Sequence, residues 1–219
     1  MAMKDCHRVF VQMMMEKQLV CEEVAVQSME RICEKFSADS PRGGLPSFLK
    51  VINKHLETVS MVIGRGISED DGTVCYAFVN THDDQYAKLA QSYDLKLIEY
   101  FKKVLDFIVN HDGVASSTDL LNAASSLEKK LKPSDANAAL HQFATDGWLG
   151  FNKRAGEYSI GIRGLIELKP YLRATYDTLP VCDLCHDVVI KGAWNNHKKV
   201  HNHCNTRAAT LMSQRAHPN

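Results

Sequence analysis

Hydrophobic residues recur three or four positions apart along the first third of the chain, which is the spacing of one face of a helix. Residues 4–36 contain two stripes of this kind and predict two helices. After a loop with Ser-Pro and Gly-Gly, Pro46 suits the first turn of a third helix. The positions that define the three stripes are Val9, Phe10, Met13, Met14, Val26, Met29, Cys33, Phe36, Leu49, Ile52 and Leu56.

The third helix is followed by two segments rich in β-branched and aromatic residues. These segments, 59–63 and 73–79, flank a polar turn at residues 68–72. Such a pattern predicts a β-hairpin. Three helices followed by a hairpin are typical of a winged helix, so we predict a first winged-helix domain over residues 1–82.

The same order of elements recurs farther along the chain. A long amphipathic helix, starting near Asp83, precedes a short helix capped by Ser117-Thr118-Asp119. A third helix begins at Pro133 and ends at Gly147, a residue suited to the left-handed position after a helix. Strands at 148–151 and 157–162 and a helical turn or two at 164–171 follow. We predict a second winged-helix domain over residues 83–176, although the two segments do not align as a sequence repeat.

Candidate chemistry is concentrated in residues 177–219. Cys182 and Cys185 are followed by fifteen residues and then by His201 and Cys204. Zinc takes four nitrogen or sulfur ligands, and two short-spaced pairs on separate turns supply them. A module with so few large apolar residues needs such a metal to fold. The alternatives are that His197 or His203 replaces His201, or that the cysteines are incidental in a disordered tail.

Composition narrows the classes of protein that remain. The 219 residues are 45% hydrophobic, which permits one or two cored domains, and the formal net charge is +0. No apolar run approaches the roughly 20 residues that span a bilayer, so we expect no membrane segment. We also expect no secretory signal and therefore an intracellular protein with reduced thiols. Cys6, Cys21, Cys33 and Cys75 are then expected to be ordinary buried cysteines.

Two segments of the module resemble a known family. Leu179-Pro180-Val181-Cys182-Asp183-Leu184-Cys185 and Lys199-Val200-His201-Asn202-His203-Cys204 are similar to the variant RING finger of the RING-bearing non-SMC element subunit of the SMC five–six complex. The resemblance covers essentially the whole chain and implies a mostly α fold with small β wings, in which tandem winged helices precede a RING-like zinc module. It assigns Cys182, Cys185, His201 and Cys204 to one Zn²⁺.

The second zinc site of that family is incomplete in this sequence. The family has a Cys-x-x-Cys before the histidine, where this chain reads Ala193-Trp194-Asn195-Asn196-His197. A further Cys-x-x-Cys after Cys204 is also absent. Either the finger is degenerate, or the sequence lacks residues of the full protein. Adding one cysteine on each side of Asn195-Asn196 restores the family spacing, which favours missing residues.

The resemblance also implies a function. A RING finger has no catalytic nucleophile; it binds a charged ubiquitin-conjugating enzyme and positions it for transfer. The family is a ubiquitin ligase that works with a MAGE-type subunit and a kleisin subunit in nuclear DNA repair and chromosome maintenance. Candidate partner contacts are the apolar residues Leu184, Val188, Val189 and Ile190. Packing around the zinc is the alternative role for these four, and a non-catalytic scaffold is the alternative for the chain.

Two other classes fit the sequence poorly. The third helix of the second domain contains no Lys or Arg, and a DNA reader needs cationic contacts to phosphates. The five Lys or Arg residues from Lys191 onward allow weak or indirect DNA contact only. A metal-dependent hydrolase needs an open metal position, which four protein ligands would fill.

Overall fold

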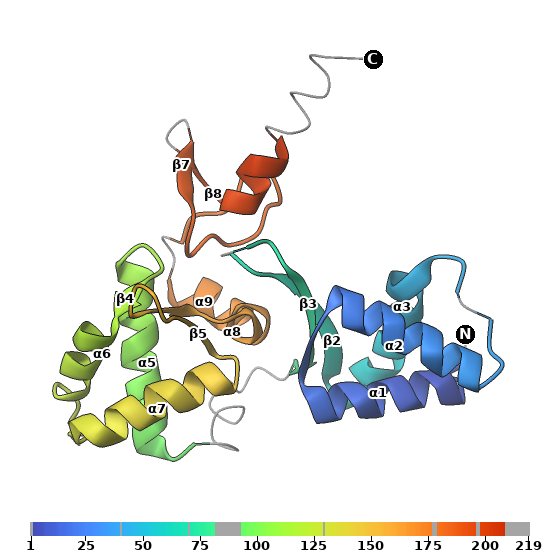
Figure 1. Ribbon diagram of the computed structural model, residues 1–219, viewed down its shortest axis with the longest axis horizontal. Coiled ribbons are helices and arrows are strands. Elements are labelled where there is room, and N and C mark those ends of the chain that lie inside the picture. Colours follow the sequence, from blue (N-terminus) through green and yellow to red (C-terminus); the bar gives the residue numbers. More distant parts are fainter. Residues whose placement is uncertain are drawn as a thin grey trace. The chain divides into compact units, whose positions relative to one another are not determined.

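The structure is a computed structural model that describes residues 2–39, 41–69, 71–81, 93–128, 130–176, 179–195 and 198–208. Contacts divide the chain into two compact units. The first comprises Met1–Ile67 with Thr73–Gln85, and the second comprises Ser68–Gly72 with Tyr86–Asn219. Both are mostly helical, with small antiparallel sheets (Figure 1). The short turn Ser68–Gly72 therefore groups with the second unit, although it joins two strands of the first.

The first unit contains the three predicted helices and the predicted hairpin. A short additional strand, β1, lies between the first two helices and pairs with β3, giving the sheet order β1-β3-β2. The elements are α1 (Asp5–Lys17), β1 (Leu19–Cys21), α2 (Glu22–Lys35), α3 (Gly44–Leu56), the 3-10 helix η1 (Glu57–Val59), β2 (Met61–Ile67) and β3 (Val74–Asn80).

The helical stripes read from the sequence form the core of this unit. Phe10, Met14 and Ile52 are fully buried in it. The side chain of Asn53 joins α3 to β2, because it accepts a hydrogen bond from the Ile63 N–H at 2.8 Å and donates one to the Ile63 carbonyl at 3.1 Å. These two bonds hold the last turn of α3 against strand β2.

The second unit repeats this order of elements. Its sheet order, β4-β6-β5, corresponds to β1-β3-β2 in the first unit. The corresponding elements are α5 (Leu95–Asn110), β4 (Ala115–Ser116), α6 (Ser117–Ala124), α7 (Pro133–Thr145), β5 (Leu149–Asn152) and β6 (Glu157–Ile160). They are followed by α8 (Ile162–Glu167), α9 (Lys169–Thr175), β7 (Ala193–Asn195) and β8 (Lys198–Val200).

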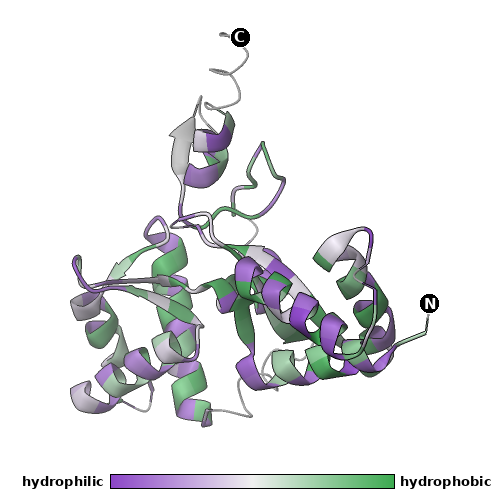
Figure 2. Ribbon diagram, turned by 45° about the vertical axis from the view of Figure 1, so that its right-hand side comes forward, coloured by the Kyte–Doolittle hydropathy of each residue, from purple (hydrophilic) through white to green (hydrophobic). Residues whose placement is uncertain are grey.

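Aromatic rings fill the core of the second unit. Phe143 contacts Tyr93 and Phe101 edge-on, and Arg163 covers the ring of buried Trp148 at 4.4 Å. In Figure 2 hydrophilic and hydrophobic residues alternate around the helices, as expected for helices buried on one side.

Among the described residues, none of the helices has the length and apolar character needed to span a membrane.

Several boundaries differ from the sequence predictions. Asp94 caps α5 by accepting from the Leu97 N–H at 2.8 Å, while the predicted start near Asp83 lies outside the described residues. The cap of α6 is Ser116 rather than Ser117, because Ser116 Oγ accepts from the Asp119 N–H. Gly147 has the predicted positive φ, 79°, and ends α7.

Candidate metal centre

A tight loop presents the first pair of candidate ligands. Cys182 and Cys185 lie between two residues that form an isolated antiparallel bridge, Val181 and Val188. Inside the loop the Cys182 N–H donates to the Asp187 carbonyl, and the His186 N–H donates to the Cys182 carbonyl, both at 2.8 Å. These bonds turn both thiols toward the same side.

The second pair follows the hairpin of β7 and β8. His201 comes directly after β8, and residues 202–208 are helical. The Asn205 N–H donates to the His201 carbonyl, so His201 begins this helix. Residues three apart at the start of a helix share a face, which directs Cys204 to the same side as His201.

The four predicted ligands meet in space. The donor atoms of Cys182, Cys185, His201 and Cys204 all lie within 4.8 Å of one another. His201 Nδ1 is 3.3 Å from Cys185 Sγ and 3.9 Å from Cys204 Sγ. Cys182 is fully buried and packs with Val189 and Val200 in a small apolar cluster. The cluster can hold a metal ion, and three thiols with one imidazole match the donor types that zinc takes.

The electrostatics of the cluster favour positive charge at its centre. Burial lowers the pKa of His201, but hydrogen bonds with Glu69 and Cys182 outweigh it and raise that pKa to about 10. Burial raises the pKa of Cys182, but hydrogen bonds from backbone groups at His201 and in its own loop lower it to about 6. Burial and the Cys185 thiol raise the pKa of Cys204 to about 12. A site that stabilises an imidazolium beside a thiolate also suits a metal cation, whose binding displaces such protons.

His203 and His197 were the alternatives to His201 as the fourth ligand. His203 stacks on His201 with ring centroids 5.0 Å apart, and both of its ring nitrogens are buried without a hydrogen-bond partner. It is not among the four clustered residues. His197 lies outside the described residues. The structure therefore brings His201, and not His203, to the three thiols.

The candidate partner contacts divide into two groups. Leu184 is 51% exposed at the tip of the cysteine loop, next to half-exposed Val181. Val189 and Ile190 are buried, and Val188 packs on the core of the second unit. Packing around the four ligands fits Val189, which clusters with Cys182, whereas Val188 and Ile190 pack on the core of the second unit and Leu184 is exposed. The role of all four in binding stays a prediction.

Glu69 contacts His201 of the site but was not predicted from the sequence. Glu69, in the turn between β2 and β3, is 7% exposed and lies 3.3 Å from His201 Nε2. It also accepts the backbone N–H of Ile190, a residue 121 positions away. Glu69 is the first of three consecutive acidic residues in a polar turn, and nothing in the local sequence marks it for such a contact, so only the structure could find it.

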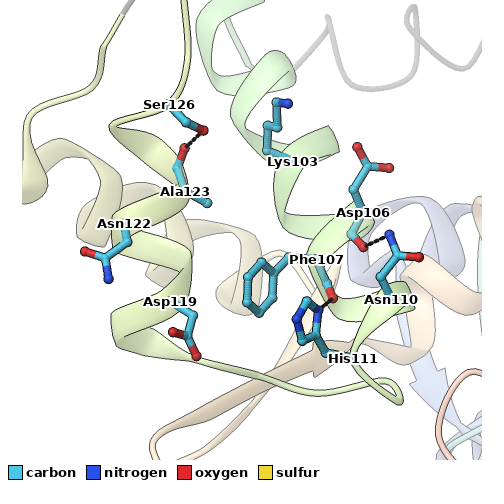
Figure 3. A pocket seen from close by; sticks show the side chains of 9 residues that line it. All are labelled: Lys103, Asp106, Phe107, Asn110, His111, Asp119, Asn122, Ala123 and Ser126. Carbon is cyan, nitrogen blue, oxygen red and sulfur yellow. Dashed lines mark hydrogen bonds between the residues drawn. The ribbon is translucent and has the colours of Figure 1, made fainter.

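Asp187 and a groove between α5 and α6 are two other polar features of the described residues. Asp187 pairs with Lys169 and Arg173, and the Lys169 contact helps to hold the pKa of this partly buried carboxyl below its usual value, so it is not poised as a base. A groove of about 440 Å³ lies between α5 and α6 (Figure 3). Several of its polar groups already have protein partners: Asn110 donates to the Asp106 carbonyl, Ser126 donates to the Ala123 carbonyl, and the Asp106 carboxylate accepts from the Tyr176 hydroxyl.

The fold and the site together define a mostly helical protein with a Cys/His cluster near the C-terminus that could hold a metal ion. The family model described as "Nse1 non-SMC component of SMC5-6 complex" matches residues 7–125. The chain belongs to this Nse1 family. The resemblance read from the cysteine and histidine segments is therefore confirmed.

Curated relatives agree with this assignment. The chain is 34% identical over 194 residues to "Non-structural maintenance of chromosomes element 1 homolog" of Homo sapiens, covering 87% of this chain and 72% of the relative. It is 31% identical over 144 residues to "Non-structural maintenance of chromosomes element 1" of Schizosaccharomyces pombe, covering 64% and 61%. A chain of a solved "Nse1-Nse3-Nse4 complex" matches with a TM-score of 0.85 at 28% identity, covering 96% of this chain and 92% of that chain.

Proposed function

We propose that this chain is a RING-type ubiquitin ligase subunit of the SMC5-6 complex that carries one zinc ion on Cys182, Cys185, His201 and Cys204. The observation that carries the proposal is the convergence of these four donors in a member of the Nse1 family. Bound zinc would supply a structural cross-link between the cysteine loop and the His201–Cys204 segment.

The ligase role depends on positioning rather than on a catalytic residue. Leu184 and Val181 are exposed apolar residues in the segment that carries Cys182 and Cys185, and we propose that they contact a ubiquitin-conjugating enzyme. Such docking would speed ubiquitin transfer by orienting the charged conjugating enzyme toward its acceptor. The chain's own residues bind and orient, while the conjugating enzyme carries the reactive thioester.

We further propose that both helical regions are winged helices that bind protein partners. The support is the shared order of helices and strands and the equivalent sheet orders β1-β3-β2 and β4-β6-β5. The matching solved chain belongs to a complex with Nse3 and Nse4, so a MAGE-type and a kleisin subunit are the proposed partners. The proposed domains are residues 1–82, 83–176 and 177–219.

DNA contact is proposed to be weak or indirect. The helix α7, which would read DNA in a winged helix, contains no Lys or Arg and carries Asp135 in its first turn. Phosphate neutralisation supplies most of the affinity of DNA-binding proteins, and α7 offers none. The proposed location is nevertheless the nucleus, on chromosomes, through membership of the complex.

The competing function is a non-catalytic scaffold with a one-zinc finger. The segment that would supply a second site includes residues 196 and 197, which lie outside the described residues. The scaffold and the ligase share the zinc site and the partners, and they differ only in ubiquitin transfer.

The deciding experiment measures discharge of ubiquitin from a charged conjugating enzyme. The chain is assayed in complex with Nse3 and Nse4, beside a Leu184→Ala variant. Faster discharge with the wild type, reduced by Leu184→Ala while the complex stays assembled, supports the ligase. A zinc-loaded, assembled complex that leaves discharge unchanged across a panel of conjugating enzymes supports the scaffold instead.

A further inference from the structure

Glu69 reaches the metal module from the turn between β2 and β3. Its carboxylate oxygens accept two successive backbone N–H groups, from Ile190 at 2.8 Å and from Lys191 at 3.0 Å. Burial of a carboxylate is costly unless hydrogen bonds compensate it. This nearly buried side chain is satisfied by the segment that follows the cysteine loop.

The same carboxylate faces one edge of the His201 ring. Glu69 Oε1 lies 3.3 Å from His201 Nε2, and the Val188 carbonyl lies 3.0 Å from the same nitrogen. The opposite nitrogen, Nδ1, faces the thiols of Cys185 and Cys204. The two nitrogens therefore have separate partners: acceptors at Nε2 and the metal cluster at Nδ1.

Neighbouring contacts fix the segment that Glu69 holds. Lys199 Nζ donates to the Ile190 carbonyl at 2.9 Å. A Cβ on Gly113 would lie 2.8 Å from that carbonyl oxygen, and one on Gly72 would lie 2.9 Å from the Cβ of His203. Both glycines have positive φ. Close packing against Gly113 and Gly72 leaves the backbone at Ile190 and the His203 side chain, which stacks on His201, little freedom to shift.

We propose that Glu69 is a positioning residue of the metal centre, which holds His201 with a proton on Nε2 and with Nδ1 free to bind zinc. The inference rests on the zinc site proposed above. Metal-binding histidines commonly donate their other N–H to a carboxylate or carbonyl, which fixes the tautomer and the ring orientation. Glu69 and the Val188 carbonyl supply both kinds of acceptor.

The test compares zinc affinity in three variants of the full chain. Glu69→Ala removes the carboxylate, and Glu69→Gln keeps its shape but removes its charge and one acceptor. Glu167→Gln is the matched control, because Glu167 is equally buried in the same unit and bonds to Arg163 at 2.8 Å instead. Chelator competition measures the dissociation constant for zinc, and imidazole ¹⁵N NMR measures the tautomer of His201.

We expect both Glu69 variants to bind zinc roughly 10- to 100-fold more weakly, the usual effect of losing such a partner, with Glu167→Gln unchanged. In the zinc-loaded wild type the NMR signals should show a metal on Nδ1 and a proton on Nε2. Equal affinity in Glu69→Gln and Glu167→Gln, or zinc on Nε2 in the wild type, would overturn the positioning role alone. A wild type that binds no zinc would overturn the proposed site together with this inference. The wild-type NMR result needs no variant, so it decides even if Glu69→Ala fails to fold.

Discussion

Individual side chains in this protein differ in how far the local sequence reveals their role. Cys182, Cys185, His201 and Cys204 were identified by spacing, and the structure places their donor atoms within 4.8 Å. Glu69 could not be identified in this way, because its partners are distant along the chain. Two ligands on one turn can be recognised from their short spacing in the sequence. A contact between residues far apart in the sequence depends on the fold that brings them together.

The cysteines of the cluster and the isolated cysteines should respond differently to replacement. Cys182→Ser removes a fully buried thiol that faces three other donors, so we expect loss of bound zinc and of order in the module. Cys33→Ala is the matched control, since Cys33 is also buried but packs in the core of the first unit. Elemental analysis of both purified proteins checks the prediction, and equal zinc in the two would contradict it.

His7 provides a prediction about pH. It stacks on Phe48 at 4.4 Å and accepts the Lys4 N–H, and burial lowers its pKa below the ordinary 6.5. As the pH falls below 6.5, His7 is protonated in the unfolded chain before it is protonated in the folded chain. The proton therefore favours the unfolded chain, and His7 lowers the free energy of unfolding as the pH falls toward its folded pKa.

Urea denaturation of the wild type and of His7→Gln at several pH values isolates this contribution. The free energy of unfolding of the wild type should decline relative to the variant between about pH 7 and pH 5. A difference between the two proteins that stays constant over this range would show that His7 does not titrate differently on folding.

At the scale of elements, long amphipathic helices were predictable and very short strands were not. The stripes through Phe10 and Ile52 predicted buried helix faces correctly, because helical periodicity is visible over several turns. Strands β1 and β4, of three and two residues, were missed. Their existence depends on pairing with β3 and β6, which no local pattern records.

The joint between α3 and β2 should depend on one side chain. Asn53→Ala leaves the Ile63 N–H and carbonyl without their partner, and we expect a loss of about 1–3 kcal/mol in the free energy of unfolding. Asn110→Ala is the control, since exposed Asn110 donates to the Asp106 carbonyl one turn earlier on its own helix. Its effect should stay within about 0.5 kcal/mol. Equal effects in urea denaturation would contradict the proposed joint.

At the scale of the whole molecule, one order of helices and strands occurs twice and is followed by a segment that carries the Cys/His cluster. The strand orders of the two main sheets correspond, although the sequence shows no alignable repeat. Hydrophobic pattern and turn chemistry specify this architecture without identical residues. The segment that carries the Cys/His cluster contacts the rest of the second unit at three places. Ile190 donates its N–H to Glu69 and packs against Gly113, and Lys199 donates to the Asp112 carboxylate.

The most direct test of the account is the zinc content per chain of the purified protein, with the intact mass recorded on the same sample. For a chain whose mass matches this sequence we predict about one tightly bound zinc, which is lost in Cys182→Ser and retained in Cys33→Ala. A protein of matching mass that carries no zinc in metal-replete buffer would contradict the metal centre, and with it the proposed role of the C-terminal module.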